Sequence, residues 1–285
     1  MVRPLRIEYP GAVYHVMSRG NDKRPIYLTI FDRHAFFEIL NHVVNRYNWL
    51  CHGYCLMENH YHLLIETVDP TLSIGMRHLN GVYSQYFNRN HEKVGHLFQG
   101  RFKSILVEKS TYLLELIRYI VLNPVRADIT RSPEEWKWSC YGDIAGLRPP
   151  REFLTTQWIL SQFAETRGRA QERYKQFVAE GIEEHDEPWK QVVGQLIYGG
   201  DEFVNDIQDR LLETRLIGEI SREQRFAGRP SLHELLPLSL LADKAARNEK
   251  IKVAHLQHGY TLTEIAGQLD IHYTTVSKVL QCRKN

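Results

Sequence analysis

The sequence predicts an α+β fold in which helices cover one face of an antiparallel sheet, followed by an all-α C-terminal region. Three observations support this prediction. Runs rich in β-branched and aromatic residues alternate with helical patterns over the first half of the chain. They follow one another in the order β, α, β, β, α, β, with a further helix after the last strand. The C-terminal segment shows helical patterns alone.

Each predicted element rests on a local pattern. The first strand ends at a polar turn cluster beginning at Ser18, and two later apolar runs are joined by a turn at Glu58 and Asn59. Pro124 should end the last of these helices near Asn123, because the residue before a proline avoids helical geometry. The predicted strands are 12–17, 50–57, 60–66 and 101–108, and the predicted helices are 32–47, 73–88 and 111–123. This is the split βαβ, ferredoxin-like order.

Two breaks rich in glycine and proline, at 146–150 and 227–231, divide the chain. The predicted parts are a first domain at 1–148, a helical linker region at 149–230 and a helical domain at 231–285. The formal charge is +4 over 1–150, −5 over 151–240 and +3 over 241–285. The two basic ends permit nucleic-acid binding without proving it, since scattered charges are also common on solvated surfaces.

The sequence offers no targeting or membrane signal. It contains no apolar run of membrane-spanning length, and its first residues include a proline and charges where a signal peptide needs an apolar core. We therefore expect a soluble intracellular protein with no membrane partner. Among its four cysteines, Cys51 and Cys55 form a lone CxxxC with no second pair to complete a zinc site. Reduced, mostly buried thiols are the favoured interpretation.

Two histidines stand two residues apart in the predicted strand 60–66. Because side chains alternate between the faces of a strand, His60 and His62 project from one face and Tyr61 from the other. Two imidazoles that converge in this way can bind a divalent cation and leave coordination positions open for phosphate oxygens. The alternative is a pair of ordinary core or surface residues, in a chain that has 14 histidines. A metal site also needs a third ligand, and a reaction needs a nucleophile.

Both could come from the helix after the last strand. Tyr119 and Asn123 stand at i and i+4, and therefore on one face of that helix. An amide oxygen from Asn123 could complete a metal site that Tyr119 faces. A phenol with an ordinary pKa of about 10 is a poor nucleophile, so a metal and Arg118 or Arg126 would help to form the phenolate. Alternatively, Tyr119 is a core residue of an amphipathic helix, and Asn123 marks an ordinary helix end.

Three segments taken together resemble a known family. They are ENHYH at 58–62, GHLFQGRFK at 95–103 and RYIVLNPVRA at 118–127. The chain resembles the single-tyrosine HUH transposases and, within that group, is most similar to the REP-associated tyrosine transposases of bacteria. The resemblance covers about residues 5–145. It implies an HUH nuclease core with a ferredoxin-like sheet, and a cytoplasmic, nucleoid-associated location in a bacterium.

The resemblance also implies roles for individual residues. His60 and His62 match the histidines that hold Mg²⁺ or Mn²⁺, and Asn123 matches a further polar metal ligand. Tyr119 matches the tyrosine that forms a 5′-phosphotyrosine link and frees a 3′-hydroxyl. Tyr61 is a mild departure, because its position is usually bulky and apolar in the family. The residues expected around DNA are Arg19, Gly20, Arg101, Lys103, Arg118 and Arg126.

The C-terminal segment carries a second signal. Thr261 to Glu264 form a capping box, and Ala266 and Val276 fall where a helix-turn-helix needs close packing. With an earlier helix at about 242–257, the segment would form a three-helix unit similar to the DNA-binding end of the replication initiator DnaA. The residues expected to face DNA are Tyr273, Thr274, Thr275 and Lys278. A packing bundle is the alternative; the basic charge and polar helix favour DNA.

The combined expectation is a transposase-like enzyme that cleaves and rejoins single-stranded DNA next to hairpins such as REP palindromes. It would act as a monomer or homodimer, and its C-terminal domain could bind duplex DNA. One alternative is a catalytically silent regulator that binds DNA hairpins. Another is an HNH-like nuclease built on Asn59, His60 and His62, in which water attacks. That class needs a helix directly after the hairpin to supply ligands, and residues 67–90 offer chiefly His78.

Overall fold

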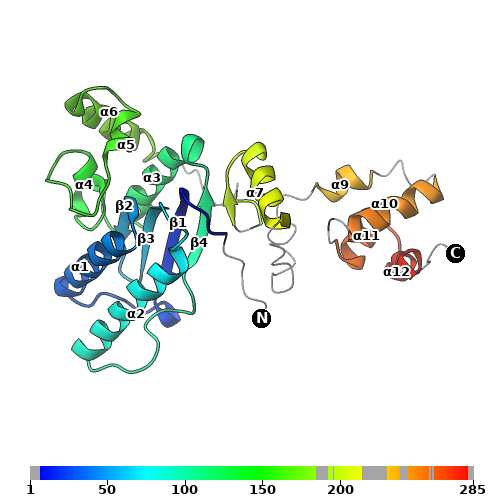
Figure 1. Cartoon of the computed structure of the whole chain (residues 1–285), viewed down its shortest axis with the longest axis horizontal. Helices are drawn as coiled ribbons and strands as arrows, with labels where there is room; N and C mark the ends of the chain where they lie inside the picture. The colour runs from blue at the N-terminus through cyan, green and yellow to red at the C-terminus, as the bar shows by residue number, and fades with distance from the viewer. Residues whose placement is uncertain are drawn as a thin grey trace. The chain divides into compact units, whose positions relative to one another are not determined.

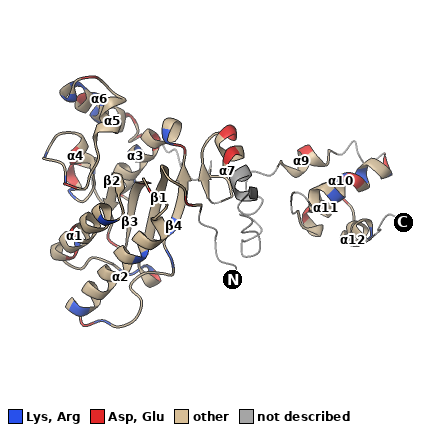
Figure 2. Ribbon diagram, in the orientation of Figure 1, with Lys and Arg blue, Asp and Glu red and all other residues tan. Residues whose placement is uncertain are grey.

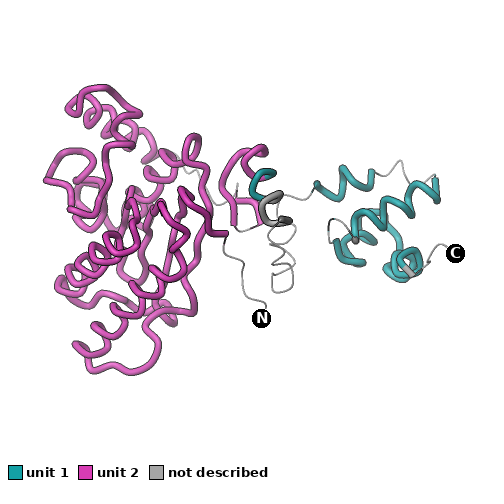
Figure 3. Tube along the Cα trace, viewed as in Figure 1, with its two compact units in different colours: residues 1–5, 205–285 teal, residues 6–204 magenta. Residues whose placement is uncertain are grey.

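The computed structural model describes residues 7–183, 192–194, 196–213, 230–237, 243–256, 258 and 260–281. The chain forms two compact units, residues 6–204 and residues 205–285 with 1–5 (Figure 3). The strands, all in the first unit, are β1 (Ala12–Arg19), β2 (Trp49–Leu56), β3 (His60–Thr67), β4 (Lys103–Val107) and β5 (Ile197–Tyr198). Its α-helices are α1 (Ile30–Arg46), α2 (Leu72–Asn90), α3 (Lys109–Arg126), α4 (Tyr141–Ile144), α5 (Gln157–Ser161) and α6 (Arg167–Glu180). The domain boundaries expected at 148 and 230 stay predictions.

The five strands form one sheet in the order β2-β3-β1-β4-β5. The first four are antiparallel neighbours, as the ferredoxin-like order requires, and His62 of β3 pairs with Met17 of β1 and Cys55 of β2. At the edge, β5 runs parallel to β4 through the pair Leu106 and Ile197. The predicted α+β class is therefore confirmed. β5 has no counterpart in the prediction, because a strand of two residues is too short to show an alternating pattern.

Helices lie on both faces of this sheet (Figure 1). On β3, the ring of Tyr61 contacts Phe36 of α1, whereas the ring of the next residue, His62, contacts Tyr119 of α3. Since neighbouring side chains on a strand point to opposite faces, α1 and α3 cover opposite faces. α2 packs beside α1. The expected layer of helices on one face is thus formed by α1 and α2, and α3 adds a second layer.

The helix α3 differs from its prediction at the C-terminal end. It continues through Pro124 to Arg126, whereas the sequence predicted an end near Asn123. Pro124 has no N–H to donate to the carbonyl of Ile120. The side chain of Asn123 compensates, because its Nδ2 donates to the carbonyl of Tyr119 at 2.9 Å and to that of Ile120 at 3.5 Å. These side-chain bonds let the helix accommodate the proline for one more turn.

Part of the predicted linker region packs on the sheet. The guanidinium of Arg151 lies 3.8 Å from the ring centroid of Phe37 in α1 and donates to the hydroxyl of Tyr54 in β2 at 3.0 Å. The backbone N–H of Thr155 donates to the carbonyl of Cys51 at 2.7 Å. As expected, Cys51, Cys55 and Cys140 are free and buried. Cys282 lies outside the described residues. Residues 151–155 are therefore held against β2 and α1.

The C-terminal part of the chain is helical, as predicted. Its helices are α7 (Asp201–Glu213), α9 (Leu232–Leu235), α10 (Lys244–Leu256), α11 (Leu262–Leu269) and α12 (Tyr273–Gln281). Acidic residues mark the start of α7 (Figure 2). The predicted capping box is confirmed, since Thr261 accepts from the N–H of Glu264, whose carboxylate accepts from the N–H of Thr261. Ala266 and Val276 are buried in one apolar cluster of α9 to α12. Among the described helices, none is long and apolar enough to cross a membrane.

Candidate active site on the histidine face

His60 and His62 lie on the sheet face that α3 covers, which we call the histidine face. Their ring centroids are 5.0 Å apart, so the alternation of β3 does bring both imidazoles together. Tyr61 is buried on the opposite face, which we call the α2 face. There its hydroxyl donates to Oδ1 of Asn80 in α2 at 2.6 Å, which satisfies a polar group that would otherwise be costly to bury.

A third histidine, which the sequence reasoning missed, completes the histidine face. His15 of β1 is fully buried, and its Nε2 lies 2.9 Å from Nδ1 of His62. The two ring planes are 3° apart, with centroids separated by 5.1 Å. The available signal was a histidine in the middle of the predicted apolar strand 12–17, where a buried polar side chain needs a partner. What the sequence did not provide was the pairing of β1 with β3 that supplies this partner.

Burial favours the uncharged form of these imidazoles. Desolvation lowers the pKa of His15 from its ordinary value to about 3. Desolvation also lowers the pKa of His62 well below the ordinary value, and the neighbouring His15 and His60 act in the same direction. The pKa of His60 is lowered by burial first and by the charge of Arg19 second. A neutral imidazole is the form that can bind a metal ion.

The donor set fits a divalent cation. Nε2 of His62 is buried and has no hydrogen-bond partner, while its Nδ1 is engaged with His15. Nδ1 of His60 is engaged as well, 2.7 Å from Oδ1 of Asn59. The described residues hold no cluster of three or more His, Cys, Asp and Glu side chains suited to a metal ion. A site with His60 and His62 would thus need oxygen from another source, such as an amide, water or phosphate.

Tyr119 reaches this face from α3 of the same chain. Its ring meets that of His62 edge-on, with centroids 6.2 Å apart and planes at 82°. The guanidinium of Arg126 lies 5.1 Å from the centroid of the Tyr119 ring, seven residues along the same helix. At this distance the guanidinium makes a cation–π contact with the ring. The structure therefore brings Tyr119, His62 and Arg126 of one chain together, and their roles in a reaction stay predictions.

Asn123 lies one turn after Tyr119, half-buried on α3. Its Nδ2 donates back to the carbonyl of Tyr119. The amide oxygen is then the atom that could bind a cation. The role of Asn123 as a metal ligand stays a prediction, and the bond to the Tyr119 carbonyl gives this side chain a structural task in addition.

The structure places Arg118 differently from the other predicted basic residues. Its guanidinium lies 4.5 Å from the ring centroid of Phe177 in α6, and a side chain at Gly181 would collide with it. Arg118 thus packs against α6. Of the two arginines that the sequence placed near Tyr119, Arg126 is the one that contacts its ring.

Arg19 is the last residue of β1, next to His60 across the sheet, and Gly20 directly follows it. Arg19 pairs with His60 across the sheet. It is also bonded twice to Gln99, because its Nη2 donates to Oε1 at 2.8 Å and its carbonyl accepts from the N–H of Gln99 at 2.8 Å. A side chain at Gly20 would collide with the carbonyl of Arg24, so this tight turn requires glycine. Lys103 is exposed and pairs with Met17, the partner of His62, and therefore shares the histidine face.

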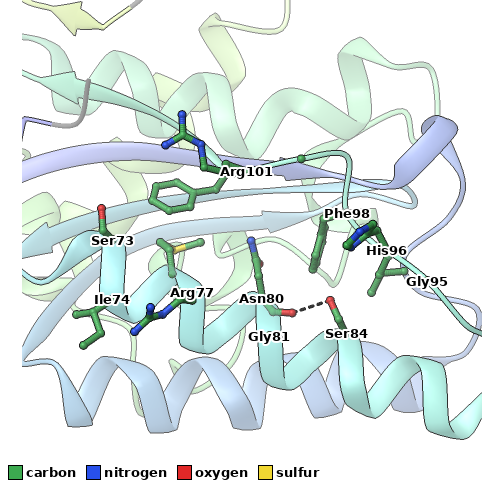
Figure 4. A pocket seen from close by; sticks show the side chains of 14 residues that line it. Ser73, Ile74, Arg77, Asn80, Gly81, Ser84, Gly95, His96, Phe98 and Arg101 are labelled. Atoms are coloured by element: carbon green, nitrogen blue, oxygen red, sulfur yellow. Dashed lines mark hydrogen bonds between the residues drawn. The ribbon is translucent and has the colours of Figure 1, made fainter. Parts of the chain in front are cut away.

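Arg101 lies at a cavity on the α2 face (Figure 4). The cavity has a volume of ≈ 660 Å³ and lies between α2 and the segment 95–102. Arg77, His96 and Arg101 contribute to its lining, which includes no aspartate or glutamate. Glu8 lies next to one end, where it accepts from the N–H of Ser73 at 3.1 Å. The lining is therefore basic, and the carboxylate of Glu8 is bound at its margin.

The predicted recognition helix of the C-terminal unit is α12. Tyr273, Thr274 and Lys278 are exposed, and Thr275 is half-buried. Val276 faces the apolar cluster instead. The exposed side of α12 is thus polar, as a DNA-reading helix requires. DNA binding by these four residues stays a prediction.

The comparisons with known proteins bear on the sheet and the site. Residues 9–123 match the family model described as "Transposase IS200 like". This IS200-like segment runs from just before β1 through Asn123, so it contains both paired histidines and Tyr119. A structure of a REP-associated tyrosine transposase bound to a REP hairpin is similar at 17% identity, with a TM-score of 0.43, over 55% of this chain and 91% of that one. The curated proteins include no match.

Proposed function

We propose that the chain is a metal-dependent endonuclease and transesterase that cleaves and rejoins single-stranded DNA next to hairpins. Tyr119 is the nucleophile, and His60, His62 and Asn123 hold Mg²⁺ or Mn²⁺. The observation that carries the proposal is the buried Nε2 of His62, which has no hydrogen-bond partner and belongs to a ring that contacts the ring of Tyr119. The match of the IS200-like segment supports it.

The reaction follows from the nucleophile. The phenolic oxygen of Tyr119 forms a bond to the phosphorus of a phosphodiester, and the bond from phosphorus to the 3′ oxygen of the preceding nucleotide breaks. The phenolic proton ends on the released 3′-hydroxyl, so the products are a 5′-phosphotyrosine and a free 3′ end. A bound divalent cation would offset the negative charge on the phosphate oxygens. Because the phosphoester link is conserved in the phosphotyrosine, a 3′-hydroxyl can later rejoin the strand without an external energy source.

Several charged side chains support DNA binding around this centre. Arg19 and Lys103 lie on the histidine face, where they can contact phosphates of the strand being cut. Arg101, at the basic cavity of the α2 face, would hold an adjacent part of the DNA. The exposed polar residues of α12 would bind duplex DNA. Action as a monomer or homodimer, in association with the bacterial nucleoid, completes the proposal.

The geometry argues against the HNH-like alternative. That class needs metal ligands from the helix that follows the hairpin, and here that helix is α2. α2 lies on the face opposite His60 and His62, as the bond from Tyr61 to its Asn80 shows. His78 of α2 instead bonds to the hydroxyl of Tyr47 at 3.2 Å. The regulator alternative is left to experiment.

The test is formation of a covalent adduct. The full-length protein is incubated with Mn²⁺ and a labelled single strand carrying a hairpin, and the products are separated under denaturing conditions. The native protein should become labelled, and Tyr119→Phe should not. Tyr112→Phe is the matched control, because Tyr112 lies on the same helix and packs against Tyr198, 4.4 Å between ring centroids. It should retain the adduct.

Other outcomes decide among the alternatives. An adduct that persists in Tyr119→Phe overturns the nucleophile. Free 5′-phosphate products without any adduct support attack by water. Hairpin binding that is unaffected by a chelator, with no cleavage of any strand, supports the regulator.

A further inference from the structure

His60 and His62 share a feature that their metal-binding role alone does not explain: each has its Nδ1 engaged by a neighbouring side chain. For His60 the neighbour is Oδ1 of Asn59, at 2.7 Å. The orientation of this amide is set by a second bond, in which Nδ2 of Asn59 donates to the carbonyl of Lys23 at 2.9 Å. Since Oδ1 can only accept, Nδ1 of His60 must carry the proton. The lone pair of His60 is then on Nε2.

For His62 the neighbour is a second imidazole. Nε2 of His15 lies 2.9 Å from Nδ1 of His62, with ring planes 3° apart. The ring centroids are 5.1 Å apart although the two nitrogens are only 2.9 Å apart. The nitrogens therefore lie between the two centroids, and the parallel rings meet edge to edge in nearly one plane. A hydrogen bond between them therefore points along the lone pair of the acceptor, which is favourable geometry. Either nitrogen could be the donor, so geometry alone leaves two tautomers.

A cation at His62 would distinguish them. If His15 donates, the proton of His62 is on Nε2, and this nitrogen then has no lone pair to offer a cation. If His62 donates, its Nε2 carries a lone pair instead, which a cation can use. The second arrangement is therefore the one compatible with a metal site.

We propose that His15 is a positioning residue that holds His62 in the Nδ1–H tautomer and aims its Nε2 at the cation, and that Asn59 does the same for His60. The inference rests on the proposed function. Side chains that accept a hydrogen bond from a ligating histidine fix its tautomer and ring orientation, and their removal lowers metal affinity by roughly 10- to 100-fold. Here the accepting group is itself a buried histidine of a neighbouring strand, so β1 and β3 together set the direction of the ligand.

The test compares two substitutions at the same position. His15→Leu fills the space without an acceptor, and His15→Gln places an amide oxygen where Nε2 of His15 was. Mn²⁺ binding is measured by calorimetry on the full-length protein without DNA, and the tautomer of His62 by ¹⁵N NMR of its ring. His15→Leu should weaken Mn²⁺ binding roughly 10- to 100-fold and populate the Nε2–H form. His15→Gln should restore most of the affinity and the Nδ1–H form.

Two controls separate the loss of this hydrogen bond from a general disturbance of the packing around it. Ile105→Val removes one methyl group from the cross-strand neighbour of His15 and should leave both readouts unchanged. Asn59→Asp keeps the acceptor for His60 and should retain more Mn²⁺ affinity than Asn59→Leu. Unchanged affinity and tautomer in His15→Leu, with a native protein that binds Mn²⁺ and forms the adduct, overturn the role of His15 alone. A native protein that binds no Mn²⁺ and forms no adduct overturns the proposed function instead.

Discussion

Two neighbouring polar side chains of β3, one on each face of the sheet, are both buried but differ in their hydrogen bonding. On the α2 face, the hydroxyl of Tyr61 is buried and donates to Asn80. One residue along the same strand, on the histidine face, His62 is also buried but keeps one ring nitrogen without a partner. Buried polar groups in proteins are nearly always hydrogen-bonded, so an unpartnered one calls for an explanation. The contrast indicates that the buried hydroxyl of Tyr61 serves stability and that Nε2 of His62 is arranged for a ligand.

The largest expected effect comes from substituting His62 on the histidine face, with a substitution of Tyr61 on the α2 face for comparison. His62→Gln should reduce Mn²⁺-dependent adduct formation by roughly 100-fold or more, because it removes a ligand rather than a supporting residue. Tyr61→Phe should retain adduct formation and lose about 1 kcal/mol of unfolding free energy, the net value of one hydrogen bond. The adduct assay and denaturant unfolding measure the two. Equal losses of activity in both variants would remove the distinction between the faces.

A second prediction uses metal removal. Mn²⁺ at about 100 times its dissociation constant should stabilise the native protein by about 2.7 kcal/mol, because it binds the folded state alone. Addition of a chelator should reverse the rise in Tm. In His60→Ala the Tm should not respond to Mn²⁺, while Arg77→Gln on the α2 face should respond as the native protein does. A Tm response in His60→Ala would show that Mn²⁺ binds elsewhere.

Substitutions of basic residues on the two faces should affect different steps, DNA binding on the α2 face and also adduct formation on the histidine face. Arg101→Gln should weaken binding of a single strand and leave Mn²⁺ affinity unchanged. For each phosphate that the variant no longer neutralises, the slope of log affinity against log salt should fall by about 0.7. Lys103→Gln should in addition slow adduct formation, since Lys103 shares the face with His62. Fluorescence anisotropy over a salt series measures the slope, and an unchanged slope in Arg101→Gln would exclude phosphate binding by this arginine.

The smallest effect concerns the attachment of α3 to the histidine face. Hydrogen bonds from His52 and then from Lys109, the first residue of α3, hold the pKa of Glu66 below its ordinary value of 4.5. A carboxyl with a lowered folded pKa stabilises the protein above its unfolded pKa and loses that contribution as the pH falls through the folded value. Glu66→Gln should therefore lower Tm at pH 7, and the difference from the native protein should shrink below about pH 4.5. A difference that is constant with pH would contradict this assignment.

The sequence predicted the parts of the site that depend on local periodicity. The alternation of β3 placed His60 and His62 together, and the helical spacing placed Tyr119 and Asn123 on one side of α3. It missed His15, because its partner is 47 residues away and depends on which strands become neighbours. It also could not assign Arg118 to α6, since that contact depends on tertiary packing. The end of α3 was misplaced because the side chain of Asn123 compensates for Pro124.

Two hydrogen bonds between Arg19 and Gln99 connect the histidine face with the segment on the α2 face. Gln99 belongs to the segment that bounds the basic cavity, and Arg19 stands opposite His60. Any occupant of the cavity that shifts this segment also shifts the surroundings of His60, the proposed metal ligand. Thermodynamic linkage makes such an effect reciprocal. If DNA in the cavity raises the affinity for the cation by some factor, the cation raises the affinity for that DNA by the same factor. Titrating one in the presence and absence of the other would measure their thermodynamic coupling directly.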